Sequence, residues 1–247
     1  MANTYDQIAI VAHRGGSALA PENTLVAFRN ALRIGVEMVE CDVHLSKDGA
    51  VVVMHDPSLE RTTNGSGLIA DKTLAELKTL NAAAKFGDGA QVERIPTLEE
   101  VLDLVKGKAR VQIEIKAGTG IEQKIVDMLH AKDMVSEVII ISFNFPSINT
   151  VKELDKNIAT GALVGGLPND KTPEEIVEHI METTHADFFL PYYAPVDAAL
   201  VKAVHARGMK IGVWTVNTSA DMRRMADFGI DALTTDRPDE LRRMLGR

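Results

Sequence analysis

The chain has 247 residues, of which 45% are hydrophobic and 25% charged, and this composition fits a large globular domain with ample apolar surface for a core. A formal net charge of −8 at pH 7 argues against nucleic acid as a partner and against electrostatic docking on anionic lipid. A small anionic substrate would therefore need cationic side chains close to it.

The first seven residues lack the basic start and the apolar stretch of a secretory signal. No run of about 18 apolar residues occurs, so we expect no membrane insertion. The single cysteine, Cys41, cannot form an intramolecular disulfide, and its neighbours predict a buried thiol without redox chemistry. We expect a cytoplasmic protein, although a secreted form cloned without its signal would have the same sequence.

Taken in order, the chain alternates short apolar runs with amphipathic segments. An apolar run at 8–12 predicts a strand, and the periodic segment from Pro21 to Ile34, ended by Gly35, predicts a helix. A second strand and a hairpin follow, and residues 57–96, which are rich in Gly, Thr and Asn, interrupt the pattern with one short helix at 73–80. The alternation then returns, with strands at 110–116, 138–142, 159–164, 188–190, 210–215 and 231–234 and helices at 98–105, 121–131, 146–154, 173–181, 197–206, 220–228 and from Pro238.

Eight strands, each followed by a helix, predict the α/β class and a (β/α)8 TIM barrel more readily than an open sheet. We expect a single domain over residues 1–247, with 57–96 as a small insertion after the second strand, over the C-terminal mouth of the barrel. Working residues of such barrels lie at this mouth, where the strands end. The polar and aromatic residues at the predicted strand ends are His13, Arg14, Glu40, Asp42, Glu114, Lys116, Asn144, Tyr192, Trp214 and Asp236.

A hairpin is predicted directly after the second strand. The Asp-Gly pair at 48–49 separates two strand-like runs, and glycine accepts the positive φ of a tight turn. A two-residue turn would place Lys47 opposite Ala50 and, counting back, Asp42 opposite His55. A one-residue bulge at the glycine would slip this register.

Three carboxylates are expected to converge at the mouth. Glu40 and Asp42 are two residues apart and share one face of the second strand, and Glu114 belongs to the inward set of the third. Such acids would repel one another without a cation, and oxygen ligands favour one divalent Mg²⁺, Ca²⁺ or Mn²⁺ ion over zinc. The alternative is a structural network in which the acids are paired by the cations Arg14, Arg110 and Lys116.

His13 and His55 are the two histidines expected at the mouth. Groups that titrate near neutrality beside a metal are suited to general acid and base chemistry at phosphorus or carbonyl carbon. Arg14 and Lys116 add fixed positive charge, which suits phosphate oxygens. We expect no chemistry of the other histidines, which are His44, His130, His179, His185 and His205.

Aromatic residues at the mouth have two interpretations. Trp214, the only tryptophan, is either a core aromatic or an apolar wall against the carbon skeleton of a substrate. Phe143 and Tyr192 could serve similarly. Asn23 is most simply the N-cap of the first helix.

The pattern as a whole resembles the glycerophosphodiester phosphodiesterase family, in its bacterial cytoplasmic type. The resemblance extends from the first strand to the eighth and rests on these motifs: His13-Arg14-Gly15, Pro21-Glu22-Asn23-Thr24, Glu40-Cys41-Asp42, His55-Asp56, Glu114-Ile115-Lys116, Trp214-Thr215-Val216-Asn217 and Thr235-Asp236-Arg237-Pro238.

The resemblance implies a TIM barrel with a small insertion and hydrolysis of glycerophosphodiesters to sn-glycerol 3-phosphate and an alcohol. It implies a divalent cation held by Glu40, Asp42 and Glu114, with His13 and His55 as the acid-base pair. Phosphate contacts would come from Arg14 and Lys116, and a pocket aromatic from Trp214.

Two other functions remain open at this point. One is a lysophospholipase D or sphingomyelinase-D-like activity on a lipid diester, and the other is a noncatalytic phosphate-binding barrel with a structural metal. The sequence also leaves open the head group, the metal, which histidine is the base, whether water or the substrate's 2-hydroxyl attacks phosphorus, and the oligomeric state.

Overall fold

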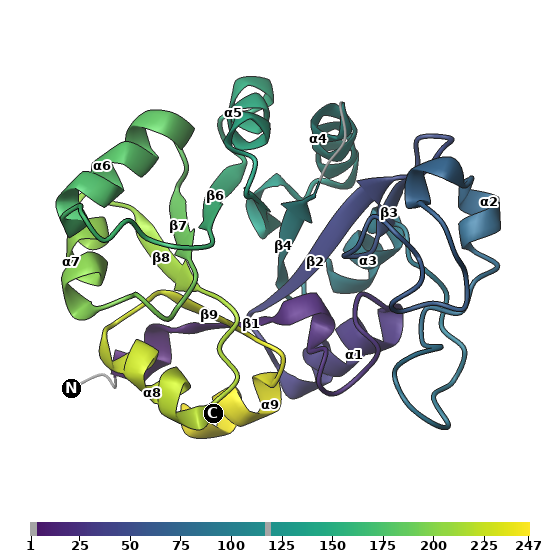
Figure 1. Ribbon diagram of the computed structural model, residues 1–247, viewed down its shortest axis with the longest axis horizontal. Helices are drawn as coiled ribbons and strands as arrows, with labels where there is room; N and C mark the ends of the chain where they lie inside the picture. The colour runs from purple at the N-terminus through teal and green to yellow at the C-terminus, as the bar shows by residue number, and fades with distance from the viewer. Residues whose placement is uncertain (1–3, 117–119) are drawn as a thin grey trace.

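The computed structural model describes residues 4–116 and 120–247, and in these residues eight parallel strands close into a barrel surrounded by helices (Figure 1). The predicted fold class is therefore confirmed. The strands are β1 (Ala9–Ala12), β2 (Met38–Leu45), β3 (Val51–Val53), β4 (Arg110–Ile115), β5 (Val138–Ser142), β6 (Ala159–Val164), β7 (Phe188–Pro191), β8 (Lys210–Val213) and β9 (Ala232–Thr235).

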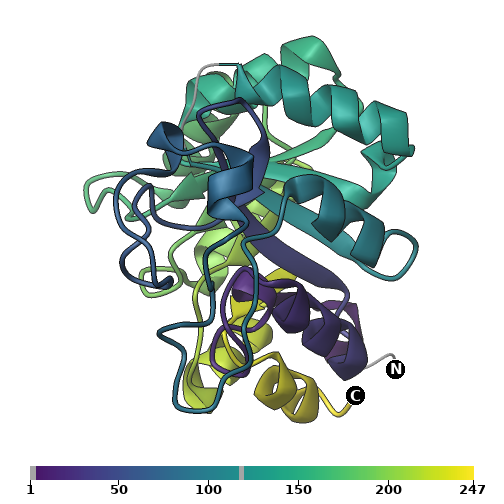
Figure 2. The ribbon, with the colours of Figure 1, turned by 90° about the vertical axis from the view of Figure 1, so that its right-hand side faces the viewer.

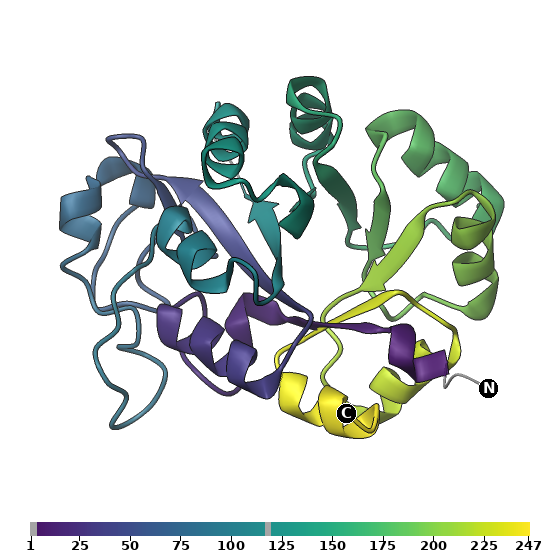
Figure 3. The same cartoon turned by 180° about the vertical axis from the view of Figure 1, so that it is seen from behind.

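Helices follow the strands and form the outer layer (Figure 3). None of the helices in the described ranges is both long and apolar enough to cross a membrane. The α-helices are α1 (Leu25–Ile34), α2 (Leu74–Leu77), α3 (Leu98–Val105), α4 (Ile121–Lys132), α5 (Phe145–Leu154), α6 (Pro173–Thr184), α7 (Ala198–Ala206), α8 (Ser219–Asp227) and α9 (Pro238–Met244), and the short 3-10 helices are η1 (Thr4–Gln7), η2 (His13–Gly15), η3 (Ile69–Asp71) and η4 (Val135–Glu137).

The ring runs in the order β1-β9-β8-β7-β6-β5-β4-β2 and closes between β1 and β2. β2 is the longest strand, and it has three partners. It pairs with β1 through Met38 and Val39, with β4 over residues 38–43, and with β3 over residues 43–45. β3 is antiparallel to β2 and pairs with the last three residues of β2, beyond the part of β2 that pairs with β1.

Side chains divide into two layers along each strand. On β2 and β4 the odd-numbered residues, such as Cys41 and Ile113, pack with the helices in the main core. The even-numbered residues point into the barrel, as the alternation predicts. The interior has a polar half on β2 and β4 and an apolar half that includes Ile139, Ile141, Leu163, Phe188 and Leu190.

The hairpin between β2 and β3 has a different register from the one a two-residue turn predicts. Leu45 lies opposite Val51, and the Ser46 N–H donates to the Ala50 carbonyl, so three residues form the loop. Gly49, at φ +80°, supplies the extra residue. The expected pairing of Asp42 with His55 is therefore wrong by one residue.

The first helix is capped by Thr24 and not by Asn23. The Thr24 hydroxyl accepts from the Ala27 N–H, and α1 ends at Gly35 with φ +83°. Asn23 has φ +57°, a left-handed conformation that asparagine tolerates better than most residues. Its side chain is thereby free to bond elsewhere.

Residues 57–96 have a small apolar cluster of their own, on the β2 side of the barrel (Figures 1 and 2). The predicted helix at 73–80 is shorter in the structure, α2, and begins with a capping box between Thr73 and Glu76. Its Leu77 is buried with residues of β3 and the flanking loops, in the cluster Val52, Met54, Leu59, Ile69, Leu77, Ala82 and Ile95.

Candidate active site

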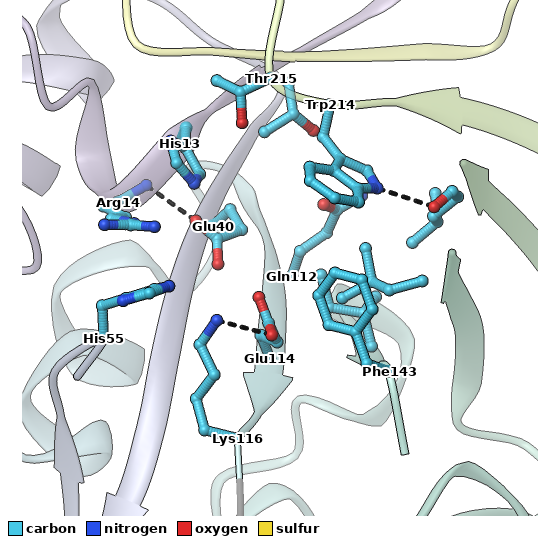
Figure 4. A pocket seen from close by; sticks show the side chains of 14 residues that line it. His13, Arg14, Glu40, His55, Gln112, Glu114, Lys116, Phe143, Trp214 and Thr215 are labelled. Atoms are coloured by element: carbon cyan, nitrogen blue, oxygen red, sulfur yellow. Dashed lines mark hydrogen bonds and ion pairs between the residues drawn. The ribbon is translucent and has the colours of Figure 1, made fainter. Parts of the chain in front are cut away.

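A cavity of about 200 Å³ lies at the C-terminal mouth of the barrel (Figure 4). Of the nine residues expected to form a site, eight line it, and the ninth, Asp42, is buried beside them. The cavity is lined by His13, Arg14, Glu40, His55, Gln112, Glu114, Lys116, Ile141, Phe143, Leu163, Leu190, Trp214, Thr215 and Thr234.

Two neighbouring strands bring the three carboxylates together. Glu40 and Asp42 follow one another on the inner face of β2, and Glu114 of β4 lies opposite Asp42 in the parallel register. One carboxylate oxygen from each lies within 4.8 Å of the others, and all three side chains are buried. The expected convergence of the acids is present in the structure.

Burial and the neighbouring charges shift the pKa values of these three acids in different directions. Burial, and then the charges of Asp42 and Glu114, raise the pKa of Glu40 well above its ordinary value. Burial and Asp42 likewise raise the pKa of Glu114 to about 7. Burial also disfavours ionised Asp42, but Lys116 and Arg14 outweigh it and lower the pKa of Asp42 to about 2.

The donor set fits a hard divalent cation. Glu40 Oε1 is buried and has no hydrogen-bond partner within residues 4–116 and 120–247. Asp42 Oδ1 is buried too, and the Lys116 ammonium lies 2.9 Å from it. A buried carboxylate oxygen without a partner is costly, and a cation with oxygen ligands would satisfy it.

Two cations flank the acids. The Lys116 ammonium lies 2.7 Å from Glu114 Oε1 as well as contacting Asp42. The Arg14 guanidinium lies 3.4 Å from Asp42 Oδ2, and the Arg14 backbone N–H donates to Glu40 Oε2 at 2.8 Å. Arg14 has φ +51°, and this left-handed turn directs its N–H toward Glu40.

A purely structural network of three cations does not describe this cluster fully. Arg14 and Lys116 pair with the acids, but the third cation of that alternative, Arg110, has a buried Nε without a partner among the described residues. Both Arg14 and Lys116 also line the cavity. Their positive charge is thus available to an anion that enters it.

Each of the two histidines has a carboxylate at Nδ1. His13 Nδ1 lies 2.6 Å from Asp236 Oδ1, and His55 Nδ1 lies 2.6 Å from Asp56 Oδ1. Each ring can donate a hydrogen bond from its Nδ1–H to the ionised carboxylate. The Nε2 atom of each ring then faces the cavity (Figure 4). Burial lowers the pKa of His55, although Asp42 and Asp56 oppose this effect.

The far wall of the cavity is apolar. Trp214 donates from its indole Nε1 to the Leu190 carbonyl at 2.8 Å, which fixes the plane of the ring. Phe143, 48% exposed, meets Trp214 edge to face with 5.4 Å between the ring centroids. Tyr192 packs on Trp214 at 5.7 Å, but it is not among the described residues that line the cavity.

Several residues at this mouth make contacts that the sequence did not predict. Asn23 donates to Asp42 Oδ2 at 2.8 Å, so it supports the acidic cluster. His44 is buried, and its Nε2 lies 3.0 Å from the His55 carbonyl. Asp236 was predicted at the mouth but not as the partner of His13. Closure of the barrel makes β9 a neighbour of β1, and this adjacency is a signal that could have found the pair.

Eight parallel strands with an acid- and histidine-lined mouth place this chain among the TIM-barrel enzymes. The model of the glycerophosphoryl diester phosphodiesterase family matches residues 13–240. The chain belongs to this family and is an enzyme, a phosphoric diester hydrolase.

Relatives agree over nearly the whole chain. A glycerophosphodiester phosphodiesterase of Caldanaerobacter subterraneus subsp. tengcongensis is 40% identical over 238 residues, covering 94% of this chain and 95% of that protein. The solved structure of an Oleispira antarctica phosphodiesterase in complex with its product sn-glycerol-3-phosphate is 30% identical, with a TM-score of 0.85 and 99% of both chains covered. A glycerophosphodiester phosphodiesterase from Agrobacterium tumefaciens is 29% identical, with a TM-score of 0.82, covering 95% of this chain and 98% of that one.

Proposed function

We propose that this enzyme hydrolyses glycerophosphodiesters to sn-glycerol 3-phosphate and an alcohol, with a divalent cation and with His13 and His55 as the acid-base pair. The observation that carries the proposal is the pairing of each ring's Nδ1 with a carboxylate while both rings line the cavity that holds the acidic cluster. The relative that binds sn-glycerol-3-phosphate supports the choice of product.

Glu40, Asp42 and Glu114 would hold the cation. When bound, it would supply positive charge to phosphoryl oxygens, where negative charge builds in the transition state. Arg14 and Lys116 line the same cavity and would bind the remaining phosphate oxygens. Trp214 and Phe143 would contact the carbon atoms of the substrate.

One histidine would take the proton from the attacking hydroxyl through its Nε2 as that oxygen bonds to phosphorus. The other, protonated at the start, would give its Nε2 proton to the alcohol oxygen as the bond from phosphorus to that oxygen breaks. Asp236 and Asp56 would keep each Nδ1 proton in place and stabilise the charged ring. If water attacks, this single step gives sn-glycerol 3-phosphate. If the substrate's own 2-hydroxyl attacks, the step gives a cyclic phosphate, and water would then open that ring with the two histidines in exchanged roles.

A panel of diesters tests the proposal. Glycerophosphocholine, glycerophosphoethanolamine and lysophosphatidylcholine are each incubated with chelator-treated enzyme and again after addition of Mg²⁺, Ca²⁺ or Mn²⁺. We expect metal-dependent release of sn-glycerol 3-phosphate from the first two. Faster release of choline from lysophosphatidylcholine than from glycerophosphocholine would favour a lipid diesterase, and binding without turnover would favour a noncatalytic barrel.

A further inference from the structure

Arg61, in residues 57–96, holds two carboxylates at once. Its Nη1 and Nη2 donate to the two oxygens of Glu22, each at 2.8 Å. Its Nε and Nη2 donate to the two oxygens of Asp56, at 2.5 and 3.2 Å. One planar guanidinium thus joins the loop after β1 to the loop after β3 through four hydrogen bonds.

Both of these carboxylates hold a residue that lines the cavity. Glu22 Oε1 also accepts from Arg14 Nη1 at 2.9 Å, and Asp56 Oδ1 is the partner of His55 Nδ1. Arg61 itself is not among the described residues that line the cavity. Among the residues that the structure describes, its contacts with the site are therefore those through Glu22 and Asp56.

The position of Arg61 is set by the small apolar cluster of residues 57–96. Leu59 and Thr63, two residues to either side, are both buried. The Thr63 hydroxyl donates to the Leu59 carbonyl at 2.6 Å and accepts from the Gly65 N–H, so this stretch is a closed turn. Arg61 lies on that turn between the two buried residues, and its own side chain is 45% exposed.

Arg61 lowers the pKa of both carboxylates. Its hydrogen bonds are the main reason that the pKa of Asp56 is lowered to about 2. Burial disfavours ionised Glu22, but Arg61 and Arg14 outweigh it and lower the pKa of Glu22. Both acids thus accept hydrogen bonds at any pH near neutrality.

We propose that Arg61 is a positioning residue for the reaction. By holding Glu22 and Asp56 together, it fixes the Arg14 guanidinium and the His55 ring in the orientations that the reaction uses. Residues 57–96 are the scaffold that carries it to the side of the mouth. The inference rests on the proposed function, in which Arg14 binds phosphate and His55 exchanges a proton.

The test compares Arg61→Met with a matched control, Arg94→Met. Arg94 belongs to the same segment, but it donates to backbone carbonyls of Thr79 and Leu80, away from the cavity. The assay is release of sn-glycerol 3-phosphate from glycerophosphocholine, with kcat and KM determined separately and thermal unfolding followed in parallel. We expect kcat of Arg61→Met to fall about 10- to 100-fold, the range of a small misplacement of reacting groups, and kcat of Arg94→Met to stay within about twofold of wild type.

Two further variants separate positioning from charge and from fold. Arg61→Lys retains the charge but not the planar fork, so we expect it to recover little of the lost kcat. In an Asp56→Asn background, Arg61→Met should lower kcat by a smaller factor than in the wild-type background, because one of the two carboxylates through which Arg61 acts is already altered. If Arg61→Met does not fold, Arg61→Lys alone still tests the role, because it should show a lowered kcat with a retained unfolding midpoint.

The outcomes distinguish the inference from the proposed function. If His55→Ala has normal turnover, the acid-base assignment itself fails. If His55→Ala is impaired while Arg61→Met has wild-type kcat, or while Arg94→Met loses as much as Arg61→Met, only the positioning role is overturned. Full recovery by Arg61→Lys, or additive effects with Asp56→Asn, would also overturn it.

Discussion

Replacing Glu114 by Gln should stabilise the metal-free protein above neutral pH, even though Glu114 is proposed to hold the cation. Burial and the Asp42 charge raise the pKa of Glu114 from the ordinary 4.5 to about 7. Ionised Glu114 is therefore unfavourable in the folded, metal-free state. An amide of the same shape carries no charge to desolvate.

The size and sign of the effect follow from this pKa. Between about pH 4.5 and 7 the folded state keeps the Glu114 proton and the unfolded state has lost it, so the free energy of unfolding falls as pH rises through this interval. At about 1.4 kcal/mol per pKa unit, the interval corresponds to about 3 kcal/mol. Glu114→Gln does not lose stability in this way as pH rises. Below pH 4.5 this difference between wild type and variant disappears, because Glu114 of the wild type is then protonated in both the folded and the unfolded state.

The measurement is denaturant unfolding of chelator-treated wild type and Glu114→Gln at pH 4.5 and pH 8. We expect the variant to gain about 3 kcal/mol relative to wild type between these pH values. Glu153→Gln, at an exposed position on α5, is the control and should show no such gain. Excess Mg²⁺ at pH 8 should then reverse the order, because binding to the folded state stabilises only the protein that retains all three acids.

A stability difference that does not change between pH 4.5 and pH 8 would refute the reasoning. It would mean that the acidic cluster is already neutralised without a metal, for instance by Lys116. The structural-network interpretation of these cations would then be the better one.

Three other predictions follow from the cavity. His13→Ala should lower kcat about 10²- to 10⁴-fold while the protein still folds, and near-normal turnover would remove His13 from the mechanism. Trp214→Ala should raise KM for glycerophosphocholine more than it lowers kcat, as initial rates over a range of substrate concentrations would show, and an unchanged KM would mean that the ring only fills the core. Burial disfavours ionised Asp236, but hydrogen bonds from His13, Ser17 and Asn217 outweigh it and lower the pKa of Asp236 to about 2, so Asp236→Asn should be less stable than wild type at pH 7. This deficit should shrink as pH falls from about 4 to 2, and a constant deficit in acid titrations would contradict the pairing.

The acidic cluster could be predicted from the sequence because strand periodicity is a strong constraint. Residues two apart on a strand share a face, so Glu40 and Asp42 had to point the same way. The barrel then made β4 a neighbour of β2, and its inward Glu114 lies beside Asp42. The same alternation places Cys41 and Ile113 on the opposite face, where they pack in the main core.

Local turns were harder to predict, since one sequence is compatible with more than one turn. The pair Asp48-Gly49 suits a two-residue loop, but Gly49 also suits the last position of a three-residue loop, which the structure has. Asn23 and Thr24 are both good N-cap residues, and their order alone does not show which one caps α1. A shift of one residue was enough to move Asn23 from the helix end to the acidic cluster.

Arg61 could not be found from the sequence at all. It lies in a segment without regular periodicity, and its two partners come from loops at different distances along the chain. Only the packing of residues 57–96 against the barrel brings these loops within reach of one guanidinium.

Closure of the ring has a consequence for how the enzyme folds. β1 and β2 pair through two residue pairs, whereas β2 and β4 pair through six. The proposed site lies across the short β1–β2 pairing, because the Arg14 backbone N–H, which follows β1, donates to Glu40 of β2. His13 moreover depends on Asp236, 223 residues further along the chain. We expect contacts between such distant residues to form late in folding, because a long loop must close first. Recovery of turnover after dilution from denaturant should therefore follow the slowest folding phase, after the helices and the β2–β4 pairing have formed, so that activity measures completion of the ring.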